Sequence, residues 1–244
     1  MRVQRFYTSQ PLSNGVEITL EAEPSHHLHH VLRLRTDDDI ILFNADGDEY
    51  AATLTLVSKQ GATASIGKRL RHEPGPELPI HLMIGISRGE RMDFALQKAT
   101  ELGVTRISPI FTERCVVKLD EKKSAGRMAH WRRLVINACE QSCRCRLPLI
   151  DPPLEIREAL SRQVCDLALL LDHRSHNTLQ QIGRPDSSVC ILIGPEGGLS
   201  SDERSIAERQ NFIGIRLGPR VMRTETAPLA TIAAIQTLWG DFSP

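Results

Sequence analysis

Ile191-Leu-Ile-Gly-Pro-Glu-Gly-Gly-Leu199 and Arg216-Leu-Gly-Pro-Arg-Val-Met-Arg-Thr-Glu-Thr-Ala227 are the two stretches of the sequence that decide the fold. Each follows an apolar run and precedes a helix-like pattern, so each predicts a loop at the carboxyl end of a strand. In α/β proteins, ligands bind at this edge of the sheet. The two loops therefore predict an α/β fold and also the place of its binding site.

Strand-like and helix-like stretches alternate through the second part of the chain. Strands are expected at residues 80–86, 104–111, 165–171, 189–193 and 212–217, and helices at 92–102, 128–139, 201–209 and 229–239. Such alternation predicts a mostly parallel sheet with helices on its faces.

A proline-rich stretch separates this part from the N-terminal part. His72-Glu-Pro-Gly-Pro-Glu-Leu-Pro79 is typical of a linker, because proline and glycine disfavour both helix and central strand. Before it, short strand-like runs are divided by turn signals such as Asn14-Gly15 and Asp46-Gly47, which predicts a small β-barrel. We therefore expect a barrel domain at 1–71, a linker at 72–79 and an α/β domain at 80–244.

Composition and charge narrow the class of protein. The 244 residues are 41% hydrophobic, which is enough for a buried core, and no apolar run approaches a membrane span or a signal peptide. We expect a cytoplasmic protein without a membrane partner. The formal net charge is zero, yet residues 81–150 hold 13 basic and 7 acidic side chains. This basic segment suits a phosphate backbone, although an ordinary solvated surface is an equal alternative.

Two groups of residues raise the question of a metal site. Cys139, Cys143 and Cys145 lack the paired short spacings of a zinc site. The histidines between His26 and His30 are expected on a short helix, with no nearby carboxylate or cysteine to complete a site. We predict no metal, and a structural role for these histidines.

The first loop has the features of a rigid cradle. Gly194 and Gly198 permit close backbone approach, Pro195 stiffens the turn, and Ser200 with Glu203 predicts a capping box for the next helix. The loop matches neither a Walker motif nor a dinucleotide-binding fingerprint. A plain strand-to-helix turn is the alternative.

The second loop carries more functional groups than a turn requires. Arg220, Arg223 and Glu225 stand before the helix that Pro228 helps to open. Capping of that helix by Thr224, Glu225 or Thr226 is the simpler interpretation.

These motifs carry a resemblance. Together with Arg88-Gly-Glu-Arg-Met-Asp93, Gln97-Lys-Ala-Thr-Glu-Leu-Gly103 and Ala138-Cys-Glu-Gln-Ser142, the two loops are similar to those of the RsmE-type ribosomal RNA uridine-N3 methyltransferases of the SPOUT superfamily. The N-terminal half resembles the same family through Arg5-Phe6, His26-His-Leu28 and Val31-Leu-Arg-Leu34. The match spans nearly the whole chain. His29, His30, Cys143 and Cys145 depart from the family pattern or fall where it varies.

The resemblance implies a PUA-like barrel followed by an α/β domain with a deep trefoil knot. It further implies a homodimer that uses S-adenosylmethionine to make 3-methyluridine in 16S ribosomal RNA of the assembled small subunit. The cofactor pocket implied by the family motifs comprises Leu170, Leu171, Ile193, Gly194, Glu196, Gly198, Leu217, Gly218, Val221, Met222 and Thr224.

Two hypotheses concern the reaction and the RNA. Arg223 is predicted to stabilise negative charge on the uracil oxygens, while Glu225 or water accepts the N3 proton. Phosphate contacts are predicted for Arg2, Arg5, Arg88, Arg91, Lys118, Arg144 and Arg146. Ordinary pairing of Arg91 or Lys98 with Glu101 on a helix face is the alternative.

Three other classes of protein stay open at this point. A related methyltransferase that acts on another RNA and a non-catalytic RNA-binding or assembly factor both fit the fold. A dinucleotide-dependent enzyme fits less well, because the glycine spacing and the ribose-binding acid are missing.

Overall fold

The structure is a computed structural model that describes residues 3–117 and 121–242. The chain forms two compact units. The smaller unit comprises the residues up to Gly75 together with Cys139–Leu147, and the larger unit comprises Pro76–Ala138 and the chain from Pro148 onward. The division after Gly75 falls within the proline-rich stretch at 72–79.

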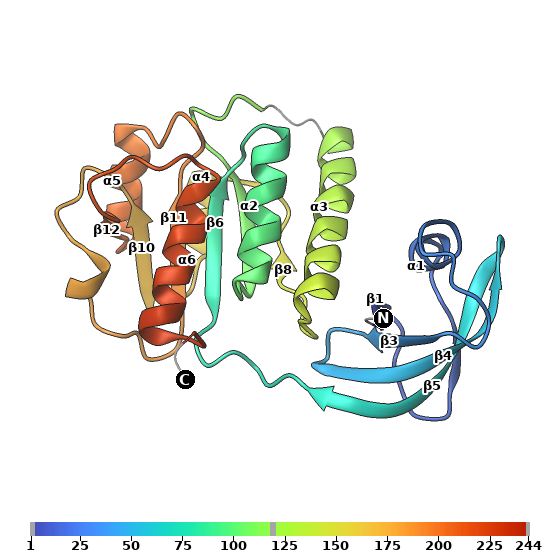
Figure 1. Cartoon of the computed structure of the whole chain (residues 1–244). Coiled ribbons are helices and arrows are strands. Elements are labelled where there is room, and N and C mark those ends of the chain that lie inside the picture. Colours follow the sequence, from blue (N-terminus) through green and yellow to red (C-terminus); the bar gives the residue numbers. More distant parts are fainter. Residues whose placement is uncertain (1–2, 118–120, 243–244) are drawn as a thin grey trace. The chain divides into compact units, whose positions relative to one another are not determined.

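The smaller unit is built on a five-stranded sheet in the order β1-β3-β4-β5-β2 (Figure 1). Its strands are β1 (Gln4–Tyr7), β2 (Glu17–Thr19), β3 (Asp39–Phe43), β4 (Asp48–Ser58) and β5 (Gly61–His72). The pairing of β1 with β3 is parallel and the other pairings are antiparallel. The helical turns α1 (Ala22–His26) and η1 (His27–Val31) follow β2.

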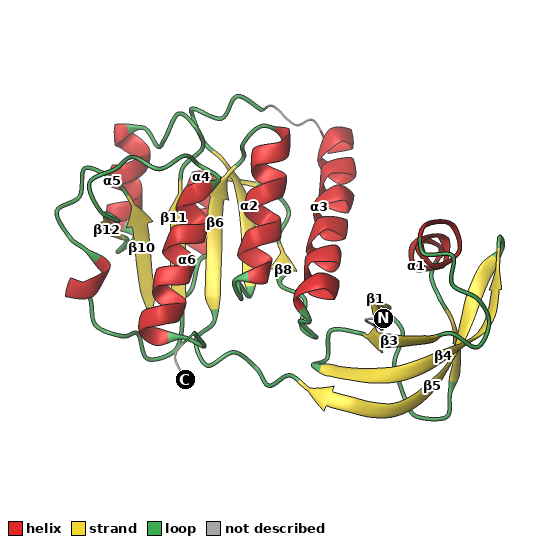
Figure 2. Ribbon diagram, viewed as in Figure 1, coloured by secondary structure: helices red, strands yellow, loops and turns green. Residues whose placement is uncertain are grey.

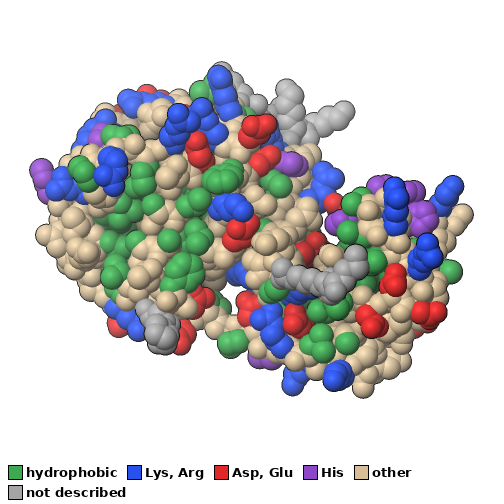
Figure 3. All heavy atoms as spheres, viewed as in Figure 1, with side chains coloured by type: hydrophobic (Ala, Val, Ile, Leu, Met, Phe, Trp, Pro, Cys, Tyr) green, Lys and Arg blue, Asp and Glu red, His purple; other side chains and the backbone are tan. Residues whose placement is uncertain are grey.

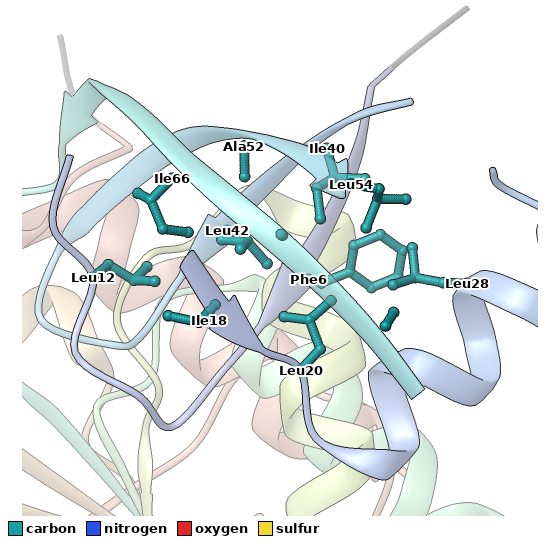
Figure 4. Packing of buried hydrophobic residues seen from close by; sticks show 12 residues of the cluster. Phe6, Leu12, Ile18, Leu20, Leu28, Ile40, Leu42, Ala52, Leu54 and Ile66 are labelled. Atoms are coloured by element: carbon teal, nitrogen blue, oxygen red, sulfur yellow. The ribbon is translucent and has the colours of Figure 1, made fainter. Parts of the chain in front are cut away.

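Alternating apolar side chains of these strands build the core of the smaller unit. Phe6, Ile40, Leu42 and Leu54 are almost completely buried, and Leu28 from η1 covers them (Figure 4). Burial of such side chains contributes roughly 1.5–3 kcal/mol each. The predicted small β-barrel is thus confirmed, and its helical segment is anchored by Leu28.

Gly47 explains how the segment 139–147 packs on this unit. Gly47 lies in the turn between β3 and β4 with φ of 104°. A Cβ at this position would lie 2.5 Å from Arg146 Nη2 and 2.7 Å from Glu73 O. Only glycine leaves room for this approach while adopting the left-handed conformation.

The larger unit contains a seven-stranded sheet in which every pairing is parallel. The order is β12-β10-β11-β6-β7-β8, and β9 pairs with β7. The strands are β6 (Ile80–Gly85), β7 (Arg106–Phe111), β8 (Leu149–Ile150), β9 (Leu154–Glu155), β10 (Leu167–Leu171), β11 (Val189–Ile193) and β12 (Ile213–Ile215).

Helices cover both faces of this sheet, as expected for a parallel sheet (Figure 2). On one face, α4 (Ile156–Arg162) and α5 (Ser201–Arg209) pack on a cluster that includes Met83, Leu170 and Leu192. On the other face lie α2 (Gly89–Glu101) and α6 (Thr226–Trp239) (Figure 1). The remaining helical segments are α3 (Glu121–Ser142) and the short η2 (Leu179–Gln181).

Most predicted elements are present, and α5 begins and ends at the predicted residues. The capping box of Ser200 and Glu203 is confirmed, with Glu203 N donating to Ser200 Oγ at 3.3 Å and Ser200 N to Glu203 Oε2 at 2.8 Å. The structure does not support side-chain capping of α6, because its N-cap residue Glu225 makes no side-chain capping bond. Instead, Arg223 O accepts from the backbone N–H groups of Thr226 and Ala227.

Candidate active site

The carboxyl ends of β6, β10, β11 and β12 lie at one edge of the parallel sheet. The loop 194–199 follows β11 and the loop 216–225 follows β12. The expected meeting of the two loops is therefore a consequence of strand order.

The first loop is a tight turn held against β6. Gly198 N donates to Pro195 O at 2.8 Å, and Gly198 has φ of 67°. A Cβ on Gly85, at the end of β6, would lie 2.4 Å from Pro195 N. Backbone therefore packs on backbone here, which fixes the loop with little room for adjustment.

Thr224 joins the second loop to the first. Its buried hydroxyl donates to Gly194 O at 3.0 Å and lies 3.3 Å from Ser87 Oγ. Ser87 Oγ in turn donates to Gly85 O at 3.3 Å. Thr224 thus links segments that are far apart in the sequence, and its hydroxyl is occupied by these contacts.

A cavity of about 490 Å³ opens between the two loops and the end of β10. All the residues predicted for the cofactor line it, and so do Arg223 and Glu225. The walls combine apolar side chains such as Leu171, Leu217 and Met222 with exposed backbone polar groups of the glycine-rich turns. Such a lining suits an organic ligand with a flat ring and several hydrogen-bonding groups.

Several charged cavity residues escaped the sequence prediction. They are Arg114, Asp172, His173, Arg174 and Arg204. Arg204 Nη1 donates to Leu199 O at 2.7 Å, and Arg114 Nη1 donates to Gly197 O at 3.0 Å, so both brace the first loop. The run Asp172-His-Arg174 could have been predicted from the sequence, because it directly follows an apolar strand.

Glu196 lies at the rim of the cavity and is charged. Its Oε1 accepts from Arg88 N at 3.2 Å and from Arg91 Nη1 at 3.4 Å. Although burial raises the pKa of Glu196, hydrogen bonds from its own backbone and from Arg88 N, with the charge of Arg91, lower it overall. The rim of the cavity therefore carries the negative charge of Glu196 next to the positive charge of Arg91.

Glu225 and Arg223 differ in exposure. The Arg223 side chain is 79% exposed, whereas that of Glu225 is 18% exposed, and Arg223 Nη1 lies 4.0 Å from Glu225 Oε1. Glu225 Oε2 is buried and has no hydrogen-bond partner among the described residues. A buried carboxylate oxygen without a donor is free to accept a proton or a ligand hydrogen bond.

The residues predicted to contact RNA are scattered. Arg88 is exposed, and Arg91 lies on the cavity rim. Arg144 and Arg146 belong to the smaller unit, where Arg146 Nε donates to Glu73 O at 3.1 Å. Arg2 and Lys118 lie outside the described residues. The alternative for Lys98 is confirmed, because its Nζ donates to Glu101 Oε1 at 2.7 Å.

Arg5 has a structural placement that does not support its predicted phosphate contact. It is 8% exposed, and its guanidinium pairs with Glu49 Oε2 at 2.8 Å. Further donor groups reach the carbonyl oxygens of Cys139 and Glu140. With its donors engaged inside the smaller unit, Arg5 holds β1, β4 and the segment 139–147 together.

No group of three or more metal-ligating side chains capable of holding an ion occurs in the described part of the chain. Likewise, within residues 3–117 and 121–242, no helix has the length and apolar character needed to cross a membrane.

A parallel α/β domain with a cavity built by the loops after its strands defines a class of small-molecule-binding enzyme folds, and comparisons with known proteins identify which class this chain belongs to. An RNA methyltransferase domain matches residues 74–236, and an RNA methyltransferase PUA domain matches residues 20–67. The chain therefore belongs to the RNA methyltransferase family whose curated members are called ribosomal RNA small subunit methyltransferase E.

Individual relatives cover nearly the whole chain. Ribosomal RNA small subunit methyltransferase E of Buchnera aphidicola is 31% identical and is aligned over 99% of this chain and 96% of its own length. The Bacillus subtilis protein of the same name is 29% identical, with 96% of each chain aligned.

Solved structures of two relatives contain a bound cofactor. The enzyme of this name from Neisseria gonorrhoeae, bound to S-adenosyl methionine, is 41% identical with a TM-score of 0.92, covering 99% of this chain and 100% of the other. A structure from Legionella pneumophila with bound SAM is 35% identical with a TM-score of 0.95 and the same coverage.

Proposed function

We propose that this protein transfers a methyl group from S-adenosylmethionine to N3 of a uridine in 16S ribosomal RNA. The observation that carries the proposal is the convergence of both loops on one cavity, in a chain whose relatives are crystallised with this cofactor. The relatives' names supply the RNA, and the resemblance supplies the nucleoside.

The cavity fits the cofactor in size and chemistry. Its volume of about 490 Å³ lies within the range of small-molecule sites. Backbone groups of Gly194, Gly198 and Gly218 offer hydrogen bonds to a ring or ribose, while Leu217 and Met222 provide apolar contact. When bound, S-adenosylmethionine supplies an electrophilic methyl group on a sulfonium.

The residues of the chain supply proton transfer and charge stabilisation. Uridine N3 carries a proton at neutral pH, so its loss must accompany formation of the N3–carbon bond and departure of the sulfur. We propose that Glu225, directly or through water, accepts this proton, because its Oε2 is buried and partnerless. The exposed Arg223 guanidinium stabilises negative charge on the uracil oxygens.

The deciding experiment is methyl transfer from labelled S-adenosylmethionine to purified small ribosomal subunits that lack the modification. Nucleoside analysis should yield 3-methyluridine. If the product were a different methylated nucleoside, the proposed substrate would be wrong. Tight cofactor binding without methyl transfer to any ribosomal particle would favour a non-catalytic assembly factor.

The proposed roles of the two charged residues are testable separately. Arg223→Ala should lower turnover at least about a hundredfold and leave cofactor affinity nearly unchanged, because the lost group acts on charge that develops in the transition state. Arg216→Ala is the matched control, since Arg216 is exposed and lies outside the cavity. Turnover of Arg223→Ala equal to that of the control would refute the role.

Glu225→Gln should reduce turnover and remove the acidic limb of the pH–rate profile, because an amide cannot act as a general base. An unchanged profile would assign the proton to water alone.

We further propose a homodimer in which α6 lies at the interface. The helix contains no charged residue, and its Leu238 is 45% exposed, as is Phe94 on α2. Exposed apolar side chains on neighbouring helices suit a partner surface. Sedimentation should show a dimer, and Leu238→Glu should favour the monomer.

Three features that the resemblance implies complete the proposal. The assembled small subunit is the substrate, the protein acts in the cytoplasm, and the chain is threaded into a trefoil knot. The bond from Thr224 to Gly194 supports the knot, since it places the segment after β12 against the end of β11.

Among the predicted phosphate contacts, Arg88 and Arg144 are the strongest proposals, because each is at least partly exposed. Subunit affinity should fall steeply with salt if lysine and arginine side chains neutralise phosphates. A flat dependence between low and moderate salt would contradict these contacts.

A further inference from the structure

A positively charged hollow lies on the smaller unit, within residues that the sequence left without a function. Its volume is about 410 Å³, and its lining includes His29, Arg33, Arg35 and Val57. These residues come from η1, from the segment after it and from β4. Histidine, lysine and arginine side chains gather on the upper part of this unit in Figure 3.

The core of the unit fixes which side chains face outward. Leu32 and Leu34 pack against the apolar core, and Leu34 N donates to Leu28 O at 3.0 Å. The alternate residues Arg33 and Arg35 are exposed as a result. Arg33 has φ of 55°, a left-handed conformation that is unfavourable for a residue with a Cβ. Burial of the leucines maintains this conformation.

Neither guanidinium has a protein partner among the described residues. The backbone of Arg35 contacts Asp38 twice: Arg35 N donates to Asp38 Oδ2 at 2.6 Å, and Asp38 N donates to Arg35 O at 3.2 Å. His29 Nδ1 is shielded from solvent and also lacks a hydrogen-bond partner. Two guanidinium groups and one ring nitrogen, all without a hydrogen-bond partner among the described residues, can donate to an anion that has several acceptor oxygens.

Next to the hollow, the rings of His26, His29 and His30 contact one another and form a histidine surface. His26 and His30 have ring centroids 4.5 Å apart with an interplanar angle of 35°, and His29 meets His30 edge to face at 4.4 Å. The wide π-turn of η1 brings these rings together. Burial and the neighbouring charges of His29, His26 and Lys59 lower the pKa of His30.

Several acidic groups lie in the segments next to this surface, and two of them accept hydrogen bonds. Asp38 accepts from Arg35 N, and Glu21 accepts from Thr8 and Ser9. Asp37 and Glu23 are exposed, and His27 packs edge to face on Phe6. No carboxylate is among the described residues that line the hollow, so a bound phosphate would meet the side chains of His29, Arg33 and Arg35 there.

We propose that the hollow and its histidine surface bind phosphates of the ribosomal RNA substrate, with an affinity that rises as the pH falls through the histidine range. The inference rests on the proposed function. A bound anion favours the protonated form of a neighbouring imidazole, so binding is coupled to proton uptake and is favoured at lower pH. Each phosphate contact also contributes a salt-dependent term.

The test uses the full chain, purified small ribosomal subunits, and the double variant Arg33→Gln/Arg35→Gln. Loss of two phosphate contacts should weaken subunit binding about tenfold or more at moderate salt, and lower the slope of log K against log salt by about 2. Lys68→Gln/Arg69→Gln is the matched control, because it removes two exposed cations from β5 of the same unit. Cofactor affinity and the unfolding temperature should be unchanged in both.

A second variant tests the proposed pH dependence of subunit binding. His26→Gln/His30→Gln should bind subunits at pH 8 nearly as the wild type does but lose the strengthening toward pH 6. Binding by the arginine variant equal to that of the control would overturn the proposal, and so would a pH dependence that survives the histidine variant. Loss of binding to phosphatidylglycerol vesicles, with subunit binding intact, would overturn it in favour of a membrane surface.

Methyl transfer separates this inference from the proposed function. If the wild type methylates subunits and the arginine variant has the same KM, the inference fails alone. If the wild type binds subunits through these arginines but transfers no methyl group, the proposed reaction is wrong and the proposed phosphate-binding surface is still supported.

Discussion

At the scale of single residues, Gly85 decides whether the cofactor loop can close on β6. A methyl group there would lie 2.4 Å from Pro195 N and 2.5 Å from Pro195 Cδ, and backbone cannot yield as a flexible side chain does. Gly85→Ala should therefore destabilise the fold by about 1–3 kcal/mol and weaken cofactor binding. Chemical denaturation and calorimetric titration measure the two effects.

Gly126 provides the control for this substitution. It lies inside α3, and a Cβ there meets nothing within 4 Å. Gly126→Ala should stabilise the helix by about 0.5–1 kcal/mol, because alanine loses less backbone entropy than glycine. Equal stability of the two variants would show that the close approach at Gly85 is unimportant.

The cysteines should differ in reactivity. A hydrogen bond from Cys190 lowers the pKa of Cys165, which is also partly exposed. Burial raises the pKa of Cys139 to about 12 and that of Cys145 to about 11. Because the thiolate is the reactive species, a maleimide should label Cys165 well before Cys139, Cys145 or Cys190 in the native protein. Peptide mapping after brief labelling checks the order.

Sequence reasoning located the cavity residues because their signal is local. Gly194, Gly198 and Thr224 belong to continuous motifs that end strands, and strand order then brings the motifs together. Arg5 carried no such signal. Its partners Glu49 and Cys139 lie 44 and 134 residues away, so its burial follows from tertiary packing alone. Composition marks an arginine as a candidate for phosphate but cannot tell a buried arginine from an exposed one.

At the scale of elements, the carboxylate of Glu49 joins three parts of the smaller unit. It accepts from Arg5 on β1 at 2.8 Å and from Arg71 on β5 at 3.1 Å. Burial raises the pKa of Glu49, but its bonds to Arg5 and Arg71 lower it overall. Arg5 in turn reaches the end of α3 through Cys139 O.

Glu49→Gln should destabilise the smaller unit by about 3–5 kcal/mol, because it leaves the buried Arg5 charge without a compensating anion. Glu158→Gln removes an exposed partner of Arg162 on α4 and should cost less than about 0.5 kcal/mol. Denaturant unfolding of both variants provides the comparison, and similar losses would contradict the importance of burial.

Predictions of elements failed where the sequence lacked periodicity. The edge strand β1 has only four residues, of which Arg5 and Phe6 are both buried, so no alternation of polar and apolar residues marks it. The short helix expected at the histidines is present, but the π-type geometry at His27–Val31 has no sequence signature. Segments such as α5 and β11 were predicted well, because an amphipathic pattern or a fully apolar run specifies them.

At the scale of the whole molecule, the two units should respond to pH in opposite directions. In the larger unit, burial, with the charge of Arg106, lowers the pKa of His81 to about 4. In the smaller unit, burial raises the pKa of Glu140 to about 7, although Tyr7 N donates to its carboxylate at 2.9 Å. Both groups are therefore neutral in the native protein over much of the range between pH 4.5 and 6.5.

The stability that each group contributes follows from linkage. For His81 the unfolded chain binds more protons than the native one, so the stabilisation is present above pH 6.5 and is lost toward pH 4. For Glu140 the native state binds more protons, so the stabilisation is present below pH 4.5 and is lost as the pH rises through 7. Each contribution amounts to at most about 3 kcal/mol.

Amide hydrogen exchange resolved along the full chain should therefore show opposite trends between pH 5 and 7, once corrected for intrinsic exchange. Protection of the larger unit should increase with pH relative to His81→Gln, because the variant lacks the titrating ring. Protection of the smaller unit should decrease with pH relative to Glu140→Gln, whose amide can still accept from Tyr7 N. A common trend in both units, insensitive to either substitution, would mean that other groups govern the stability. Opposite trends that each vanish in the corresponding variant would establish that one buried group in each unit sets its pH response.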